Sequence, residues 1–180
     1  MIFIIVTTCI NNKFYGENKT EREKRYVECI SFLIELLKNY QKIKLIIVEN
    51  NGKRSTFLDN FHCDVLYTNN NSKKLKHKAG NELLDIKEAI DKYSIRDDDF
   101  IVKITGRYKL LNLDFIKTVI NKNLYYDVFI RYINFDELMV PKENKKHNVL
   151  SNNYSTNDDC ILGLFAIKCK YLKNFEYRYN

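Results

Sequence analysis

Two short runs that are apolar on both faces restrict the fold of this chain more than any other feature. Residues 2–8 read IFIIVTT, and residues 43–49 read IKLIIVE. A strand with one solvated face alternates apolar and polar side chains, whereas consecutive β-branched residues are typical of a strand buried on both faces. The two runs therefore predict a parallel sheet that is covered by helices on both sides.

Further segments extend this pattern along the chain. Four more strands are predicted at residues 64–68, 100–104, 126–133 and 160–168. Helices with apolar side chains at helical spacing are predicted at residues 21–39, 81–93 and 114–121, and from residue 171 onward. This alternation predicts a three-layer α/β domain with a mostly parallel sheet of about six strands and helices on both faces. A length of 180 residues predicts a single domain, spanning residues 1–180.

Composition narrows the class of protein. The hydrophobic fraction is 45% and the charged fraction is 29%, which is typical of a globular protein and argues against a disordered chain. No apolar run is long enough to span a bilayer, and the five cysteines form no CxxC pair, so we expect a cytoplasmic protein with reduced thiols. The net charge of +7 favours an anionic partner: nucleic acid, a phosphorylated small molecule or a membrane surface.

The polar residues that follow the predicted strands define the expected site, because ligands of a parallel α/β sheet bind beyond the carboxyl ends of its strands. An acidic residue at the end of the second strand commonly accepts hydrogen bonds from a ribose. A ligand that touches several of these strand ends is polar, anionic and elongated, as a substituted nucleoside diphosphate is. The candidate residues at these ends are Thr7, Thr8, Glu49, Asn50, Thr105, Gly106 and Arg107.

A basic segment precedes the predicted helix at residues 81–93. Lys78 and Gly80 lie just before its first residue. Helix N-termini carry unpaired backbone N–H groups and a positive dipole that favour phosphate, and a glycine lets the backbone approach closely. We therefore predict that Lys78 and Gly80 contact a phosphate group; a solvated basic loop is the alternative.

Several common enzyme motifs are absent from the sequence. It contains no Walker loop, no GxGxxG and no GxSxG. These motifs mark P-loop NTPases, dinucleotide enzymes and α/β-hydrolases, respectively. Their absence argues against these three classes of α/β enzyme.

An ordered set of segments resembles a known family. The segments FIIVTTCINN, LIIVENNG, HKAGNELLDIKEAI, FIVKITGRYKL and DDCILGLFAIKCKYLKNF follow one another and cover nearly the whole chain. Together they resemble small nucleotide-sugar glycosyltransferases with the A-type, Rossmann-like fold, such as those of large DNA viruses and bacterial polysaccharide clusters. The resemblance implies transfer of a sugar from a nucleotide-diphosphate donor to a hydroxyl group of a glycan or glycoprotein acceptor.

The resemblance also implies roles for individual residues. The ends of the first two strands would hold the nucleoside, and Lys78 and Gly80 would approach the diphosphate or the donor sugar. Many family members carry an Asp-x-Asp motif after the fourth strand, where it binds manganese or magnesium. Thr-Gly-Arg occupies residues 105–107 here, so the chain departs from the family at this position.

The negative charge of the diphosphate could be balanced by groups at either end of the fourth strand. Asp97 and Asp99 could bind Mn²⁺ or Mg²⁺ through their carboxylates. They precede the strand, however, and its five residues span roughly 16 Å. This separation favours a metal-independent site, in which Lys103 and Arg107 neutralise the charge of the leaving group. A metal site at Asp97 and Asp99 stays the alternative.

Asp158 and Asp159 are the candidate catalytic residues. In the family that the chain resembles, a carboxylate from this late region deprotonates the acceptor hydroxyl, which implies a general-base role for these two residues. Both precede the predicted strand at residues 160–168. They can therefore reach the expected site only if this strand runs antiparallel to the others, as in a mixed sheet.

Three alternatives to a glycosyltransferase stay open. Because the Asp-x-Asp motif is missing after the fourth strand, the chain could be a catalytically degenerate domain that binds a sugar nucleotide. A nucleotidyltransferase on a similar fold is the second alternative. A nucleic-acid-binding module is the third, but it would need basic and aromatic side chains interleaved on one surface, and most tyrosines fall in amphipathic or apolar segments.

Overall fold

The structure is a computed structural model, which describes residues 1–11, 19–73, 78–132 and 160–176. Its centre is a six-stranded sheet with the strand order β3-β2-β1-β4-β6-β5. The strands are β1 (Ile2–Thr8), β2 (Ile43–Glu49), β3 (Asp64–Tyr67), β4 (Phe100–Thr105), β5 (Val128–Tyr132) and β6 (Cys160–Lys168).

The order of the strands reverses at β1. This strand pairs in parallel with both β2 and β4, and β2 pairs in parallel with β3. The chain therefore moves outward from β1 to β3 and then continues with β4 on the other side of β1. Open α/β sheets bind ligands at such a reversal, beyond the carboxyl ends of the strands.

Strand β6 runs against the direction of its neighbours. Leu164 in β6 pairs antiparallel with Ile104 in β4, and Cys160 at the start of β6 pairs with Tyr132 at the end of β5. Because β5 is antiparallel to β6, it points in the same direction as β1 to β4. The start of β6 therefore lies at the same edge of the sheet as the carboxyl ends of the other strands.

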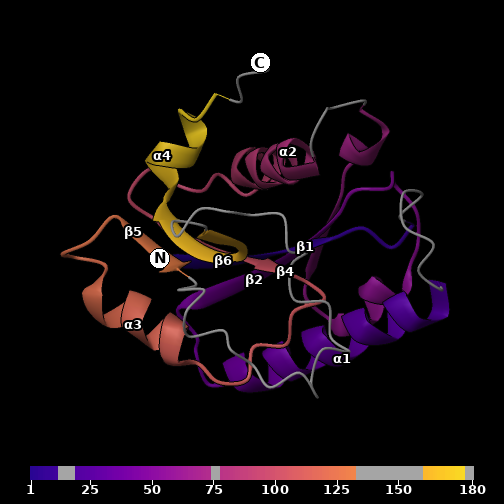
Figure 1. The fold of residues 1–180 in the computed structure, drawn as a ribbon, viewed down its shortest axis with the longest axis horizontal. Helices are drawn as coiled ribbons and strands as arrows, with labels where there is room; N and C mark the ends of the chain where they lie inside the picture. Colours follow the sequence, from indigo (N-terminus) through magenta and orange to yellow (C-terminus); the bar gives the residue numbers. More distant parts are fainter. Residues whose placement is uncertain (12–18, 74–77, 133–159, 177–180) are drawn as a thin grey trace.

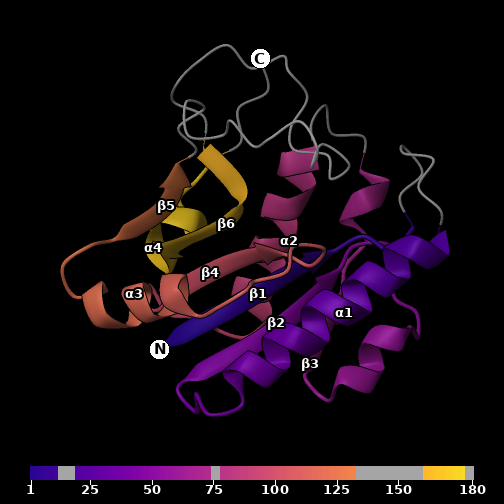
Figure 2. The same ribbon diagram turned by 60° about the horizontal axis from the view of Figure 1, so that its bottom comes forward.

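Helices cover both faces of the sheet. Figures 1 and 2 show α1 and α3 on one face and α2 and α4 on the other. The helices are α1 (Lys19–Leu37), α2 (Lys78–Lys92), α3 (Asp114–Lys122) and α4 (Cys169–Lys173), with short 3-10 helices η1 (Phe57–Phe61) and η2 (Asn70–Ser72). In the part of the chain that the structure describes, no helix is long and apolar enough to cross a membrane.

Alternate residues of β1 pack into two separate cores. Ile4 and Val6 belong to the core that also contains side chains of α1 and α3, and Phe3 and Ile5 belong to the core with side chains of α2 and α4. Full burial of each such side chain contributes about 1.5–3 kcal/mol. The apolar run at residues 2–8 is explained by this two-sided burial. The predicted fold class, a three-layer α/β domain with a mostly parallel sheet, is confirmed.

The start of α2 differs from the sequence prediction. The helix begins at Lys78 rather than at residue 81, so Gly80 lies inside its first turn instead of before it. The apolar periodicity of residues 81–93 located the helix but did not mark its first residue. Asn81 therefore lies within the first turns of the helix, and it lines the pocket described below.

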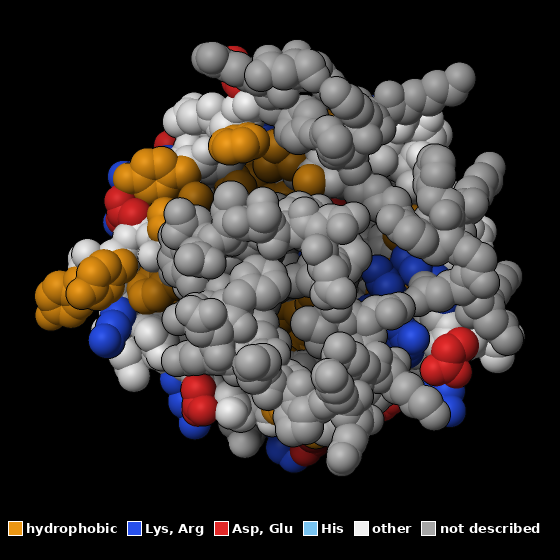
Figure 3. Space-filling view, viewed as in Figure 1, with side chains coloured by type: hydrophobic (Ala, Val, Ile, Leu, Met, Phe, Trp, Pro, Cys, Tyr) orange, Lys and Arg blue, Asp and Glu red, His pale blue; other side chains and the backbone are white. Residues whose placement is uncertain are grey.

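Exposed apolar side chains gather away from the carboxyl ends of the strands. Leu124, Tyr125 and Tyr126 are exposed in the connection between α3 and β5, at the left of the molecule in Figure 3. This connection leads into the amino end of β5. The apolar cluster and the polar strand ends therefore lie at opposite edges of the sheet.

Gly106 allows β4 to end in close contact with β1 and α1. Its N–H group donates to the carbonyl oxygen of Thr7 at 3.0 Å. A Cβ atom at this position would lie 3.0 Å from methyl groups of Val6 and Thr8 and 3.1 Å from the ring of Tyr26. Since all three side chains are buried, a side chain at position 106 would force the neighbouring segments apart.

We expect Gly106→Ala to lower the free energy of unfolding by about 1–3 kcal/mol, because the added methyl group overpacks this junction. Urea denaturation of the variant and the wild type measures the difference. An unchanged unfolding midpoint would show that β1, β4 and α1 can separate there without cost.

Candidate functional site

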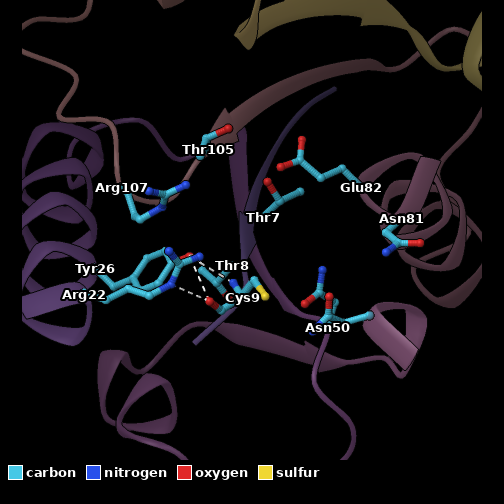
Figure 4. Close-up of a pocket in the computed structure, with 11 residues that line it drawn as sticks. Thr7, Thr8, Cys9, Arg22, Tyr26, Asn50, Asn81, Glu82, Thr105 and Arg107 are labelled. Atoms are coloured by element: carbon cyan, nitrogen blue, oxygen red, sulfur yellow. Dashed lines mark hydrogen bonds between the residues drawn. The ribbon is translucent and has the colours of Figure 1, made fainter. Parts of the chain in front are cut away.

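A polar pocket opens at the carboxyl ends of β1, β2 and β4. The first turns of α1 and α2 flank it on opposite sides, as Figure 4 shows. It lies where the order of the strands reverses, which is the position expected for a ligand in this architecture. Its lining residues are Thr7, Thr8, Cys9, Arg22, Tyr26, Asn50, Asn71, Asn81, Glu82, Thr105 and Arg107.

Arg22 and Tyr26 of α1 hold the end of β1. The Nε atom of Arg22 donates to the carbonyl oxygen of Cys9 at 2.7 Å, and the hydroxyl of Tyr26 accepts from the N–H group of Cys9 at 3.0 Å. An NH2 group of Arg22 also donates to the Tyr26 hydroxyl at 3.3 Å. Burial raises the pKa of Tyr26, so the phenol keeps its proton. These contacts fix a buried guanidinium group beside the pocket.

Glu49 ties the ends of β1 and β2 together. Its side chain is fully buried, and its carboxylate accepts hydrogen bonds from the Thr8 hydroxyl at 2.7 Å and from the N–H group of Ile10. Asn51 also donates to it, and Arg54 forms an ion pair with it at 3.1 Å. Glu49 is not among the lining residues of the pocket. Its ribose contact therefore stays a prediction from the sequence.

Asp85 ties α2 to the ends of β2 and β3. Its fully buried carboxylate accepts hydrogen bonds from Thr68 at 2.6 Å, from Asn70 at 2.8 Å and from Asn50 at 3.0 Å. Burial raises the pKa of Asp85 to about 6, because desolvation of the charged form outweighs these hydrogen bonds. A carboxylate with three neutral donors therefore lies directly behind the pocket.

Lys103 and Glu82 connect the middle of the sheet to α2. The ammonium group of Lys103 is buried, forms an ion pair with Glu82 at 2.7 Å and donates to the Thr105 hydroxyl at 2.7 Å. Glu82 and Thr105 line the pocket, whereas Lys103 does not. The positive charge of Lys103 therefore does not line the pocket, and two of its partners, Glu82 and Thr105, do.

Buried oxygen atoms of three lining side chains lack a hydrogen-bond partner among the described residues. They are the Oγ1 atom of Thr7 and the Oδ1 atoms of Asn50 and Asn81. The side chains are 3%, 5% and 9% exposed, respectively. Buried polar groups are normally paired, and an unpaired one costs about 1–3 kcal/mol. Their gathering in one pocket indicates a site for a ligand that forms several hydrogen bonds.

The structure brings together most of the residues that the sequence predicted to bind a donor. Five of them line the pocket: Thr7, Thr8, Asn50, Thr105 and Arg107. Others support it from behind, where Glu49 and Lys103 are engaged by neighbouring side chains and Gly106 packs against β1. Lys78 and Gly80 open α2 at the pocket's flank, and Gly80 is buried.

Asp97 and Asp99 lie at the amino end of β4, opposite the pocket. Asp97 is paired with Lys173 at 2.6 Å. The buried carboxylate of Asp99 accepts from the N-terminal ammonium group at 2.7 Å and from the N–H group of Arg96 at 3.0 Å. Burial alone would raise the pKa of Asp99, but these hydrogen bonds outweigh it and lower the pKa.

The described residues contain no cluster of three or more metal-ligating side chains, and the metal alternative stays a prediction. Within residues 1–11, 19–73, 78–132 and 160–176, no group of three or more His, Cys, Asp or Glu side chains could hold an ion. Glu82, the carboxylate that lines the pocket, is paired with Lys103. We therefore derive no step of the chemistry through a metal.

Asp158 and Asp159 lie outside the described residues. The condition for their predicted role is met, because β6 runs antiparallel to β4 and begins at Cys160, the residue after Asp159. Their role as general base stays a prediction.

Sequence reasoning missed the contribution of α2 to the site. Asn81, Glu82 and Asp85 were treated as ordinary positions of an amphipathic helix. A signal was present, since Asn81 and Asp85 lie four residues apart and continue the buried face that Ala89 and Ile86 form. Polar residues on an otherwise apolar helical face indicate a site at that end of the helix.

Comparisons with known proteins identify a fold but no family. No family model and no curated protein matches the sequence, whereas 36 solved chains match in structure. A protein assigned as a nucleotide-diphospho-sugar transferase from Desulfovibrio desulfuricans G20 is 10% identical with a TM-score of 0.48; the match covers 72% of this chain and 57% of that protein. This chain therefore spans little more than half of that transferase.

A second match covers more of the chain. It is CMP:2-keto-3-deoxy-manno-octonic acid synthetase in complex with CTP, which is 11% identical with a TM-score of 0.58; the match covers 96% of this chain and 76% of the synthetase. At this identity the likeness establishes the fold alone. The chain shares the fold of this synthetase, and its mostly parallel six-stranded α/β sheet is the fold class that the sequence predicted.

The pKa of Asp85 predicts a pH dependence of stability. The pKa of the Asp85 carboxyl is about 6 in the folded state, above the ordinary 3.8. Folding therefore takes up a proton between these two pH values. The free energy of unfolding falls as pH rises through this window. The loss approaches about 3 kcal/mol. In Asp85→Asn this term is absent, so we expect the wild type to lose stability relative to the variant between pH 4 and pH 7. Chemical denaturation of both proteins at each pH measures it; a constant difference would contradict the prediction.

Proposed function

We propose that the chain transfers a sugar from a nucleotide-diphosphate donor, bound in this pocket, to a hydroxyl group of an acceptor. The observation that carries the proposal is the gathering of unpartnered Thr7, Asn50 and Asn81 atoms beside the guanidinium groups of Arg22 and Arg107. Polar acceptors on one side and cations on the other suit a ligand with a nucleoside at one end and phosphates at the other.

The arrangement of the side chains gives the donor a direction. In Figure 4, Arg22 and Arg107 lie on the side of α1, and Asn50 and Asn81 lie on the side of α2. Guanidinium groups bind phosphate oxygens with charge-assisted hydrogen bonds, so we place the diphosphate toward α1. The nucleoside then lies toward α2, where its hydroxyl and N–H groups can donate to the amide oxygens.

The residues of the pocket support a substitution at the anomeric carbon of the donor sugar. The bond from this carbon to the diphosphate oxygen breaks, and a bond to the acceptor oxygen forms. Negative charge grows on the leaving diphosphate, and the fixed cation of Arg107 lowers the energy of that charge without reorganising. The proton of the acceptor hydroxyl passes to a general base, for which Asp159 or Asp158 is our candidate because β6 begins at this edge of the sheet.

A nucleotidyltransferase is the second candidate function. It is favoured by the likeness to the synthetase solved with CTP, which covers nearly the whole of this chain. In that reaction an acceptor oxygen attacks the α-phosphorus of a nucleoside triphosphate, and pyrophosphate leaves. The same cationic side of the pocket would then hold a triphosphate instead of a sugar diphosphate.

Thermal unfolding with added ligands separates the candidates. UDP-, GDP-, CMP- and TDP-linked sugars and free CTP are each added with and without Mn²⁺. A ligand at a hundred times its Kd stabilises the folded state by about 2.7 kcal/mol. We expect the largest shift from a nucleotide-diphosphate sugar; a shift with CTP alone, followed by pyrophosphate release with a sugar acid, would favour the nucleotidyltransferase. No shift with any of these ligands would refute both.

Arg107→Ala should weaken binding of the donor. Losing a charge-assisted hydrogen bond worth about 1.5–3 kcal/mol corresponds to a roughly 10- to 150-fold rise in Kd, which isothermal titration calorimetry measures. Arg96→Ala is the matched control, because its side chain is 79% exposed and lies at the opposite end of β4. Equal donor affinity in the two variants would contradict the placement of the diphosphate beside Arg107.

A further inference from the structure

The side-chain amide of Asn50 faces the protein interior with one atom and the pocket with the other. The Nδ2 atom of Asn50 donates to the Oδ2 atom of Asp85 at 3.0 Å. The Oδ1 atom of Asn50 is buried, accepts no hydrogen bond within the described part of the chain, and belongs to a residue that lines the pocket. Because an unpaired buried amide oxygen is costly, this oxygen is suited to accept a hydrogen bond from a bound ligand.

Asp85 determines which atom of this amide is left for the ligand. The Oδ1 atom of Asp85 already accepts hydrogen bonds from Thr68 and Asn70. An ionised carboxylate accepts hydrogen bonds and cannot donate. The Asn50 amide must therefore turn its NH2 group to Asp85 and present its oxygen to the pocket. The charge on Asp85, and not the shape of the pocket, fixes this orientation.

We propose that Asp85 is a specificity-determining residue that acts through Asn50, so that the pocket selects nucleotides that donate a hydrogen bond at this point. The proposal rests on the nucleotide-binding function proposed above and narrows it to a class of ligand. Asp85 does not line the pocket; it is a positioning residue for Asn50.

Asn81 gives this side of the pocket a second acceptor. Its Oδ1 atom is also buried and unpartnered among the described residues, and it comes from the first turns of α2, beside Asn50 in Figure 4. Phosphate oxygens cannot donate to these two amide oxygens, whereas a nucleoside can. The donating groups of a nucleoside are its ribose hydroxyls and the N–H groups of its base. Uracil, thymine and guanine carry a ring N–H group at the edge where the ring nitrogen of cytosine accepts and only its exocyclic amino group donates.

Few charged groups act on the carboxylate of Asp85. Glu82, one turn earlier on α2, is the charged neighbour that acts on it, and Glu82 is itself paired with Lys103 of β4. Glu49 of β2 directs its carboxylate toward β1 instead. The remaining contacts come from the ends of β2 and β3 and from η2, and they are neutral amide and hydroxyl groups.

Protonation of Asp85 changes the group that Asn50 presents to the pocket from an acceptor to a donor. A protonated carboxyl group can donate to the Asn50 oxygen, and the amide then turns its NH2 group to the ligand. Burial raises the pKa of Asp85 to about 6. This change consequently falls between pH 5 and pH 7.5, where binding is readily measured.

Two variants test the proposal without altering the shape of the site. Asp85→Asn places an amide where the carboxylate was; this amide donates to Asn50, which then presents its NH2 group to the pocket. The double variant Asp85→Asn with Asn50→Asp exchanges the two groups, so the carboxylate at position 50 accepts from the new amide and again presents an oxygen. A purely structural role of Asp85 would not predict this rescue.

Calorimetry measures the binding of UDP, GDP, CDP and the 2′-deoxy and 3′-deoxy forms of UDP and GDP at pH 7.5 and pH 5. For UDP or GDP, we expect Asp85→Asn to raise the Kd at least about ten-fold at pH 7.5, and the double variant to regain most of this loss.

Wild-type affinity should fall at pH 5 more than that of Asp85→Asn, since titration of the phosphates is common to both proteins. Weaker binding of CDP alone assigns the contact to the base N–H group, and weaker binding of the deoxy forms assigns it to a ribose hydroxyl.

A second measurement reports on the amide without any ligand. In the wild type, the side-chain NH2 resonances of Asn50 should shift with a midpoint near pH 6, and in Asp85→Asn they should not. The remaining resonances also show whether the variant is folded. Resonances of Asn50 that do not move with pH in the wild type would overturn the coupling of the two side chains.

The outcomes separate this proposal from the function on which it rests. If the wild type binds UDP or GDP and folded Asp85→Asn binds it equally well, the role of Asp85 is refuted and the nucleotide site stands. Equal wild-type affinity for all the probes also refutes it. If the wild type binds none of the probes, the nucleotide site fails, and the specificity proposal fails with it.

Discussion

The burial of β1 on both faces is the constraint on which the rest of the structure depends. Its pairing with β2 and β4 leaves no edge of the strand open, and its seven residues are all buried. Helices must therefore cover both sides, which fixes the three layers. Only where β1 ends can the chain expose polar groups between two parallel neighbours, and the pocket lies there.

Buried carboxylates organise the polar end of the sheet. Glu49 joins the ends of β1 and β2, and Asp85 joins α2 to the ends of β2 and β3. Both carboxylates are enclosed, but their partners differ: Glu49 has a guanidinium ion from Arg54, whereas Asp85 has neutral donors. Burial raises the pKa of Asp85 to about 6, so the charge of this second carboxylate is sensitive to pH. The same strand ends therefore contain one carboxylate paired with a cation and one carboxylate whose charge depends on pH.

The sequence predicted the layers, most strand bounds and five lining residues. A strand buried on both faces is recognisable from its run of apolar residues, and such a strand requires helices on both sides of the sheet. Residues 43–49 and 160–168 were predicted with the bounds that the structure shows. The direction of β6 was beyond the sequence, since an apolar run carries no sign of parallel or antiparallel pairing. The partners of Lys103 and Asp85 were equally hidden, because α2 meets them only through tertiary packing. Lys103 does not line the pocket and is paired with Glu82, which does.

The pairing of Cys160 with Tyr132 has a consequence for how such a protein can change. The chain leaves the sheet and returns to it at adjacent residues, on the edge where the pocket opens. The entropy of closing a loop grows only with the logarithm of its length, so doubling the intervening segment costs about 0.6 kcal/mol. Evolution or an engineer could exchange this segment without disturbing strand register. The paired ends of β5 and β6 can thus stay constant while the sequence between them changes.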